Sequence, residues 1–358
     1  MKRPSSPTNI SISEKYFFTL FGRCREKRIP ICGTLELTPR CNFKCKMCYI
    51  RLEPAQMKKI GRERTAAEWI ELIKSAAQAG TLILQLTGGE VFLRSDFFEI
   101  YEKAVSLGIV PIILSNAYLI DEAAVKRLAG HPPYSVSVSL YGASNATYQK
   151  LCGVRDGFDV VLRNLLLMKE NGIPIELKMT VTKENVKDFS AVEKIARENN
   201  WQFRYGYHLN NPVRGAVSEG KAMSADFGSL PQNLLSAPGK NDSLLLFPKN
   251  CGSVNAAYCI TWNGNMQLCP TASVPYTEPF QDGFINAWHS LCDQLTVIEG
   301  PNECKNCADK AFCGICLGKL YAETQDYGKV PASFCAEARE RRESFENGQL
   351  ASRHETNH

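Results

Sequence analysis

The hydrophobic pattern alternates between two periods over the first two thirds of the chain. Six short apolar runs have the length and β-branched content of strands that are buried on both faces. The runs cover residues 34–38, 82–87, 110–115, 135–140, 175–181 and 203–208. We therefore expect six buried strands in this part of the chain.

Five stretches between these runs have apolar residues at helical spacing. In the first, 65–78, Trp69 and Ile73 would lie on the same face. The other stretches are 96–106, 121–128, 158–170 and 186–198. A glycine or an asparagine follows each stretch, as is usual where a helix ends. Regular alternation of strands and helices predicts an α/β fold with a parallel sheet and right-handed crossovers.

This pattern divides the chain into four parts. Residues 1–32 form an N-terminal lead-in, and residues 33–235 hold the six strand–helix units. Six units are too few for a closed eight-unit barrel, so we expect a partial (β/α)6 barrel of the TIM type. Residues 236–345 form a smaller second domain, which follows a stretch rich in Gly, Ser, Pro and Asn. The polar tail, 346–358, is expected to be disordered.

Charge and hydropathy argue against several classes of protein. The formal net charge is only +5 over 358 residues, and no dense run of Lys and Arg suggests a nucleic-acid ligand. No segment reaches the roughly 18 apolar residues of a membrane span. The basic start is followed by Pro and Ser, so it does not resemble a signal peptide. We expect a cytoplasmic protein that binds neither nucleic acid nor membrane.

Fifteen cysteines are the unusual feature of the composition. In a reducing compartment, clustered cysteines indicate metal or redox chemistry rather than disulfides. Most of them fall into two groups, one directly after the first strand and one in the second domain. Four lie outside these groups and are interpreted as structural thiols, namely Cys24, Cys32, Cys152 and Cys292.

The first group is Cys41, Cys45 and Cys48, with the spacing C-x3-C-x2-C. Three thiolates can hold three irons of a 4Fe–4S cluster, whereas four cysteines are needed to saturate it. The fourth iron would therefore be open to an outside ligand. The competing interpretation is a structural zinc site or three unrelated thiols.

This motif resembles the signature of the radical S-adenosylmethionine (SAM) superfamily. The resemblance implies that the amino and carboxylate groups of SAM chelate the open iron, and that one electron from the cluster cleaves SAM to a 5′-deoxyadenosyl radical. It also implies an open, partial (β/α)6 barrel whose catalytic groups lie at the carboxyl ends of the strands. Met47 matches the apolar position beside the third cysteine, which in the family lies by the adenine.

Gly88, Gly89 and Glu90 end the second strand run. Glycines let the backbone approach a ligand closely, and a carboxylate can accept hydrogen bonds from an ammonium group. The resemblance assigns this stretch to the amino group of SAM. The competing interpretation is a plain turn followed by an acidic helix cap.

Polar residues at the next strand ends complete the SAM site that the resemblance implies. Ser115 and Asn116 would contact the ribose, although the family often has Thr-Asn-Gly where this chain has Ser-Asn-Ala. Ser139 would meet the carboxylate or the ribose of SAM. Arg155 could pair with that carboxylate, for which a guanidinium is well shaped; alternatively it is a solvated cation of a loop.

The second group of cysteines has the pattern C-x7-C-x9-C, then C-x2-C-x5-C-x2-C, then a last cysteine. A hairpin with an Asn-Gly turn is expected between the second and third of them, at Gly264. The whole pattern resembles the SPASM extension of radical SAM enzymes. It departs from that family by one residue between Cys313 and Cys316, where three intervening residues are usual.

A SPASM domain implies two auxiliary 4Fe–4S clusters, and so three clusters in all. The resemblance assigns an inner cluster to Cys251, Cys259, Cys269 and Cys316, and an outer cluster to Cys304, Cys307, Cys313 and Cys335. Because the two sets interleave along the chain, the domain should fold only with its metal. A four-cysteine zinc site at 304, 307, 313 and 316 is the alternative, but it leaves the other four cysteines unused.

Auxiliary clusters suit a net two-electron oxidation of the substrate. The main expectation is an enzyme that modifies a ribosomally made peptide by a crosslink, a thioether or a related C–H functionalisation. Sulfatase-maturing enzymes usually have an aspartate after the cysteine that matches Cys269, whereas this chain has Pro270. A formylglycine-generating enzyme of that type and a tetrapyrrole-modifying enzyme of the haem pathway remain alternatives.

Partners follow from the same resemblance. A flavodoxin- or ferredoxin-type protein would donate the electron. Peptide maturases often carry an N-terminal recognition module of about eighty residues, and the lead-in is too short for one. Any such module would be a separate protein or absent, and the peptide could instead dock against the barrel or the loop of residues 210–250. The sequence does not identify the catalytic base: Tyr49, Tyr141, Tyr205, Tyr207 and His208 are all candidates. A simple electron-transfer protein would have no use for the open iron beside the Gly-Gly-Glu motif.

Overall fold

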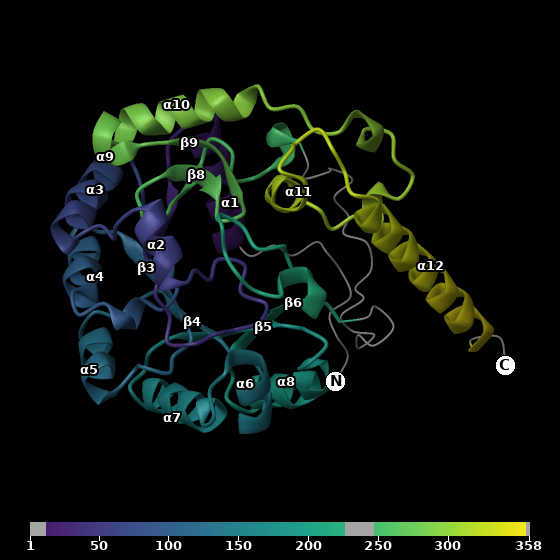
Figure 1. The fold of residues 1–358 in the computed structure, drawn as a ribbon, viewed down its shortest axis with the longest axis horizontal. Coiled ribbons are helices and arrows are strands. Elements are labelled where there is room, and N and C mark those ends of the chain that lie inside the picture. The colour runs from purple at the N-terminus through teal and green to yellow at the C-terminus, as the bar shows by residue number, and fades with distance from the viewer. Residues whose placement is uncertain (1–11, 226–246, 356–358) are drawn as a thin grey trace.

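A mixed nine-stranded sheet organises the fold (Figure 1). The computed structural model describes residues 12–225 and 247–355. The strand order is β6-β5-β4-β3-β2-β1-β7-β8-β9, and strands β1 to β6 are parallel to their neighbours. The strands are β1 (Cys32–Thr38), β2 (Ile83–Gly88), β3 (Val110–Ser115), β4 (Ser135–Ser139), β5 (Ile175–Thr180), β6 (Gln202–Gly206), β7 (Ala257–Ile260), β8 (Met266–Cys269) and β9 (Ala272–Thr277). The six predicted strands are confirmed.

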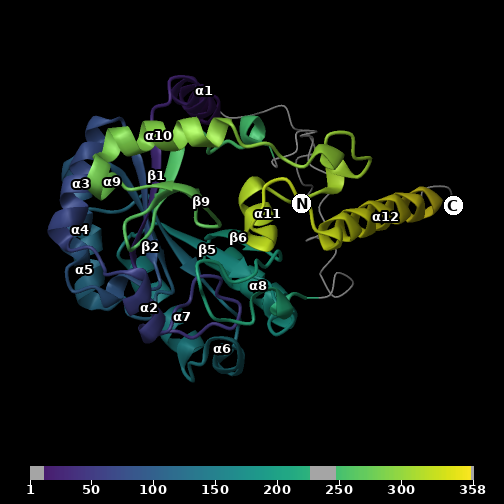
Figure 2. The same cartoon turned by 45° about the horizontal axis from the view of Figure 1, so that its top comes forward.

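Helices cover the outside of the strands in both views (Figures 1 and 2). Five of them match predicted stretches: α3 (Ala66–Gln78), α4 (Phe97–Ser106), α5 (Glu122–Gly130), α7 (Gly157–Glu170) and α8 (Phe189–Glu198). Helix α3 begins at a capping box between Thr65 and Glu68, and its face of Trp69 and Ile73 is fully buried. The predicted α/β fold with a partial barrel is therefore confirmed.

Two helices at the carboxyl ends of the strands were not predicted. Helix α2 (Pro54–Ile60) follows the cysteine loop, and helix α6 (Asn145–Cys152) follows β4. Helix α2 has no buried residue, so it has no apolar face for a periodicity argument to detect. Its signals are a Pro in the first turn and a capping box between Glu53 and Gln56. Helix α6 starts at Ser144, whose side chain accepts from the amide of Thr147.

The second part of the chain extends the sheet of the barrel. Strand β7 pairs in parallel with β1, and β8 and β9 continue the sheet in antiparallel pairs. The predicted hairpin is confirmed, and Gly264 in its turn has a φ of +106°. The predicted domain boundary between residues 235 and 236 lies outside the described residues.

The remaining elements lie mostly in the second part of the chain. Helix α1 (Ile12–Glu26) precedes the sheet, and α9 (Pro279–Asp282), α10 (Phe284–Thr296) and α11 (Leu317–Thr324) follow it. Short 3₁₀ segments are η1 (Val91–Leu93), η2 (Val186–Asp188), η3 (Gly220–Met223), η6 (Pro248–Asn250), η7 (Asn302–Cys304) and η8 (Lys310–Phe312). Within the described ranges, no helix combines the length and the hydropathy that crossing a membrane requires.

Helix α12 (Ala332–Glu355) corrects the expectation of a disordered tail from residue 346. The helix runs through residues 346–355, and the last three residues of the chain lie outside the described part. Its sequence is rich in Glu, Arg and Ala, which favour a helix even without burial. Arg342 and Glu346 also form an i,i+4 ion pair. A polar sequence was therefore mistaken for a disordered one.

Candidate active site

The cysteine loop lies at the carboxyl end of β1, and the end of α6 holds its backbone. The amides of Lys44 and Lys46 donate to the carbonyls of Cys152 and Leu151 at the end of α6, each at 2.9 Å. Cys45 is buried, whereas Cys41 is the most exposed of the three motif cysteines. Cys152 is fully buried as expected, and its thiol is hydrogen-bonded to that of Cys45.

The three motif thiols lie together in the structure. Burial, together with the nearby charges of Cys45, Glu90 and Cys48, raises the pKa of Cys41 to about 12. Metal binding must therefore supply the energy for deprotonation, as is usual for thiolate sites. No three His, Cys, Asp or Glu side chains among the described residues converge on the position of one metal ion. In a cubane cluster each cysteine binds a different iron, so its thiols need not converge on one metal position.

Gly88 and Gly89 bring the end of β2 against the start of the cysteine loop. The amide of Gly89 donates to the carbonyl of Thr38 at 2.8 Å, and the amide of Glu90 donates to that of Arg40 at 2.8 Å. A Cβ at residue 88 would lie 2.3 Å from the Thr38 oxygen, and one at residue 89 would lie 2.1 Å from the Arg40 oxygen. Only glycine permits this approach. The motif is thus more than a plain turn.

Glu90 joins the ends of β2 and β3. Its carboxylate accepts hydrogen bonds from the Ser115 hydroxyl and the Asn116 amide, both at 2.8 Å. The side chain is fully buried, and burial raises its pKa to about 7. The Asn116 side chain donates to the side chain of Asn42 at 2.8 Å, inside the cysteine loop. Asn116 Nδ2 also donates to Cys41 Sγ at 3.8 Å, so three predicted SAM contacts and the first cysteine belong to one connected polar group.

The other predicted SAM contacts are spread around the same rim. Met47 is buried in the main hydrophobic core beside the cysteine loop. Ser139 is half-buried at the carboxyl end of β4. Arg155 is exposed in the turn between α6 and α7, which agrees with the alternative of a solvated cation as well as with a SAM contact. The roles of these residues stay predictions.

The eight cysteines of the second part lie in two groups. The charges of Cys313, Cys335 and Cys307 all act on the Cys304 thiol, whose pKa burial raises to about 11. The structure thus brings these four thiols together.

The other group forms around β7 and β8. Cys269 interacts with Cys259 on the neighbouring strand and with Cys316 before α11. Tyr327 lies beside both Cys269 and Cys251. The donors in both groups are all thiols, which suits iron–sulfur clusters. The ligand assignment itself stays a prediction.

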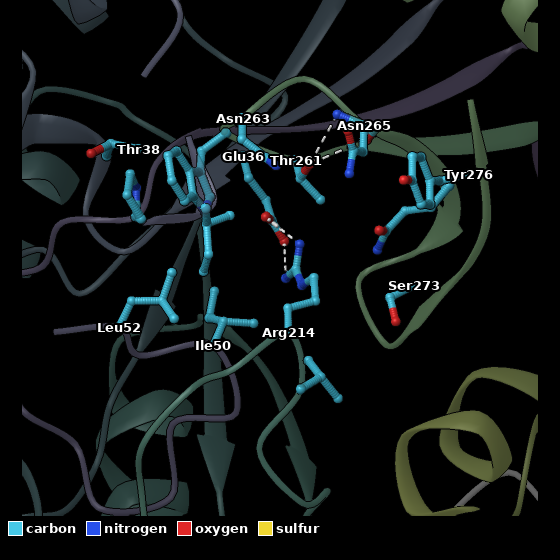
Figure 3. Close-up of a pocket in the computed structure, with 15 residues that line it drawn as sticks. Glu36, Thr38, Ile50, Leu52, Arg214, Thr261, Asn263, Asn265, Ser273 and Tyr276 are labelled. Carbon is cyan, nitrogen blue, oxygen red and sulfur yellow. Dashed lines mark hydrogen bonds and ion pairs between the residues drawn. The ribbon is translucent and has the colours of Figure 1, made fainter. Parts of the chain in front are cut away.

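A cavity of about 260 Å³ separates the cysteine loop from the hairpin that carries Cys259 and Cys269 (Figure 3). Ile50 and Leu52 line it from the cysteine loop, and Trp262 lines it from the hairpin. Ser273 and Tyr276 add hydroxyl groups from β9 (Figure 3). The cavity has the mixed apolar and polar lining that is typical of ligand sites.

An ion pair that sequence reasoning missed forms one wall of the cavity. Both Arg214 terminal nitrogens contact the Glu36 carboxylate, at 2.7 and 2.8 Å (Figure 3). Glu36 is almost fully buried on β1, and its partner lies in the loop after β6. The amide of Val213 donates to the carbonyl of Tyr49, which ties this loop to the cysteine loop. The two charged residues are 178 positions apart, so no local pattern could have indicated the pair.

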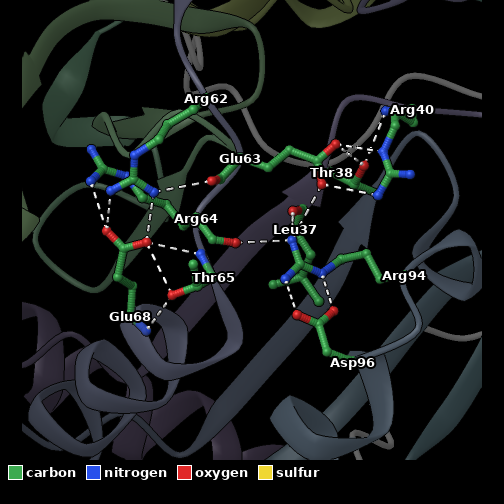
Figure 4. A network of polar contacts seen from close by, with 10 residues as sticks. All are labelled: Leu37, Thr38, Arg40, Arg62, Glu63, Arg64, Thr65, Glu68, Arg94 and Asp96. Atoms are coloured by element: carbon green, nitrogen blue, oxygen red, sulfur yellow. Dashed lines mark hydrogen bonds and ion pairs between the residues drawn. The ribbon is translucent and has the colours of Figure 1, made fainter.

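A second polar network fixes the base of the cysteine loop (Figure 4). The buried Arg94 guanidinium donates to the carbonyls of Leu37 and Arg64 and pairs with Asp96 at 2.7 Å. Glu63 accepts from Arg40, the residue before the first cysteine, at 2.6 Å. Strand β1, the start of the cysteine loop and the segment before α3 are therefore held as one unit.

Comparison with known proteins agrees with this geometry. The family model of the radical SAM superfamily matches residues 35–195. The chain contains a radical SAM domain. The matched segment includes the cysteine loop, the Gly-Gly-Glu motif and the ends of β3 and β4. Radical SAM domains imply SAM and a 4Fe–4S cluster, and they are domains of enzymes.

Curated relatives match different lengths of the chain. An Fe-coproporphyrin III synthase from Methanosarcina barkeri is 31% identical over 191 residues, which are 53% of this chain and 47% of that protein. The sporulation killing factor maturation protein SkfB from Bacillus subtilis is 26% identical over 312 residues, which are 83% of this chain and 72% of that protein. The match thus spans less than half of the length of the Fe-coproporphyrin III synthase and most of the length of SkfB.

Solved structures share the fold over nearly the whole chain. Streptococcus suis SuiB bound to S-adenosylmethionine has a TM-score of 0.63 at 18% identity, and the match covers 93% of this chain and 83% of that one. The enzyme anSMEcpe with bound AdoMet has a TM-score of 0.63 at 16% identity, and the match covers 90% of this chain and 98% of that one. The fold of barrel and cysteine-rich extension is therefore shared with SuiB and anSMEcpe.

Proposed function

We propose that the protein is a radical SAM enzyme with a SPASM domain that oxidatively modifies a ribosomally made peptide. The observation that carries this proposal is the position of the cavity. It opens between the cysteine loop on one side and the strands of Cys259 and Cys269 on the other. A substrate held there would lie between the site of SAM cleavage and an auxiliary electron acceptor.

In this proposal each rim element has a defined task. Bound at Cys41, Cys45 and Cys48, a 4Fe–4S cluster supplies the electron that cleaves SAM reductively. Gly88 to Glu90 would receive the amino group of SAM, and Met47 would lie by its adenine. Further SAM contacts come from Ser115, Asn116, Ser139 and Arg155.

The two cysteine groups of the second part would hold the auxiliary clusters. The hairpin that carries Cys259 and Cys269 of the inner group lines the cavity with Thr261, Trp262 and Gln267. The outer group, around Cys304, would pass the electron on toward the surface. A flavodoxin- or ferredoxin-type protein would supply the electron for SAM cleavage, and a separate protein would help to recognise the peptide.

The size and charge of the cavity favour a peptide side chain over a tetrapyrrole. A volume of about 260 Å³ lies below the roughly 300–1,000 Å³ that drug-sized ligands occupy. Arg214 is the one cation among the described lining residues, and Glu36 already neutralises it. The several carboxylates of a tetrapyrrole would therefore enter without partners, which is costly.

Similar proteins also support a peptide substrate. SkfB is a maturation protein by its name and matches most of this chain. One of the similar structures is SuiB bound to its precursor peptide SuiA, with a TM-score of 0.67. The proposal does not specify which bond forms, so a crosslink, a thioether or another C–H functionalisation would each agree with it. Pro270 is the one feature that disfavours a formylglycine product.

Tetrapyrrole modification is the second candidate, because the relatives also include AdoMet-dependent heme synthases. One experiment separates the two. Anaerobically reconstituted protein would be incubated with SAM, a reductant and either Fe-coproporphyrin or a synthetic peptide encoded beside the gene. A mass change in the peptide together with 5′-deoxyadenosine supports the maturase, whereas a mass change in the porphyrin overturns it.

Iron content provides the first check of the cofactors. The full chain should bind about twelve irons, and a Cys41/Cys45/Cys48→Ala variant should bind about eight, because only the SAM-binding cluster is lost. About four irons in the parent protein would remove the auxiliary clusters and with them the oxidative part of the proposal.

A further inference from the structure

Lys319 lies on α11 between the two cysteine groups of the second part. Its Nζ donates to the carbonyl of Gly314 at 3.1 Å. Gly314 follows Cys313, a member of the outer group, and precedes Cys316 of the inner group by two positions. Burial lowers the pKa of Lys319, while the charges of Cys316 and Cys313 act in the opposite direction. The ammonium group is thus close to a thiol of each group.

The surroundings of Gly314 are crowded with titratable side chains. A Cβ at this position would lie 2.9 Å from His208 Nε2 and 3.0 Å from a terminal nitrogen of Arg341. Arg341 also acts on the Cys313 thiol and lowers its pKa, against the effect of burial. The connection between Cys313 and Cys316 therefore passes between cations of α11 and α12.

The other charges near Lys319 do not cancel this positive field. Glu337 lies 3.2 Å from His208 Nδ1 and offsets one of the two cations. Burial, with Lys319 and Arg341 nearby, lowers the pKa of His208 to about 3, so the imidazole is neutral at physiological pH. Of the groups that act directly on Lys319, Arg341 is a cation and Glu337 a carboxylate, whereas Lys221 and Glu340 act on Glu337.

A positive charge stabilises the reduced form of a cluster, because that form is the more negative one. Net charge, hydrogen bonds and exposure are the main determinants of iron–sulfur potentials. We propose that Lys319 is a positioning residue that raises the midpoint potential of the auxiliary clusters, and so makes them better acceptors of the substrate's electron. The inference rests on the proposed function.

Potentiometric titration of the reconstituted full chain, followed by electron paramagnetic resonance, tests this role. The SAM-binding cluster can be set apart, because addition of SAM changes its spectrum. We expect K319M and K319Q to lower at least one auxiliary potential, whereas K319R keeps the charge and the parent potential. The K329M variant is the control, because Lys329 is exposed and pairs with Asp326.

Gln can still donate to the Gly314 carbonyl, so K319Q separates the charge from the hydrogen bond. If K319M and K319Q both hold clusters at unchanged potentials, the inference is wrong. It is also wrong if K319Q behaves as the parent protein and only K319M shifts, since the hydrogen bond would then be the cause. Absence of auxiliary iron in the parent protein would instead contradict the proposed function.

Discussion

Gly89 is the residue at which the barrel and the cysteine loop are closest. A side chain there would collide with the backbone carbonyl of Arg40, which cannot move without shifting the cysteine loop. We expect G89A to lower the free energy of unfolding by about 1–3 kcal/mol and to weaken SAM binding, as measured by urea denaturation and calorimetry. G130A is the matched control, because a Cβ there meets open space at the end of α5. Equal effects of the two variants would contradict this account.

Glu90 should make stability depend on pH. Burial raises its pKa from 4.5 to about 7, so the folded chain holds the proton more tightly than the unfolded chain does. Its contribution to stability is complete below pH 4.5 and is lost as the pH rises through about 7.

The quantity to follow is the unfolding free energy of the SAM-free parent protein minus that of E90Q. We expect this difference to fall by up to about 3 kcal/mol between about pH 5 and about pH 8. Denaturation at several pH values measures the difference. E122Q, at an exposed carboxylate, serves as the control. A difference that does not vary with pH would show that Glu90 titrates alike in both states.

At the scale of elements, helix α12 brings Cys335 to the outer cysteine group. The helix is anchored by Arg342, whose guanidinium donates to the Asp309 carboxylate at 2.7 Å. Asp309 is largely buried, so its pair should be stronger than a fully exposed one. The anchoring contact therefore lies close to three of the four thiols of the outer group.

The substitution D309N should release α12 while leaving the barrel folded. We expect a faster tryptic cleavage in α12 and a loss of iron from the outer group, because Asn cannot pair with two arginines. The E343Q variant changes an exposed carboxylate of the same helix and should behave as the parent protein. Unchanged proteolysis of D309N would mean that other contacts hold the helix.

At the scale of the whole molecule, the hydrophobic cores of the described residues differ greatly in size. The main core runs through the barrel and the hairpin, whereas the core near the outer cysteines has four buried members in the described part of the chain, namely Cys304, Ile315, Leu320 and Phe334. So small a core cannot offset the entropy of ordering its segment. Metal binding should supply the difference.

Removal of iron should accordingly unfold the second part first. We expect amide hydrogen exchange to accelerate in α11 and α12 after chelation, while β1 to β5 keep their protection. The barrel strands of the same sample serve as the internal control. Equal protection with and without iron would show that the small core is sufficient.

The barrel could be predicted from the sequence because its signals are local. Strand runs, helix periods and terminal glycines repeat within some thirty residues, and the first cysteine motif is contiguous. Helix α2 was not predicted because it has no buried residue. The end of α12 was not predicted because its polar sequence resembles that of a disordered tail. The two errors have the same cause, because a hydrophobic pattern indicates which residues are buried and not which residues are helical.

The sequence by itself determined the chemistry of the site, since cysteine spacing and the Gly-Gly-Glu motif restrict which ligands can bind. Only the tertiary structure showed that Arg214 pairs with Glu36 and that β7 pairs with β1. It also showed that the charges of Cys313 and Cys316 act on Lys319. Contacts such as these form between segments up to more than two hundred residues apart. They depend on how the sheet is ordered and on which faces are buried, and no period along the chain encodes either.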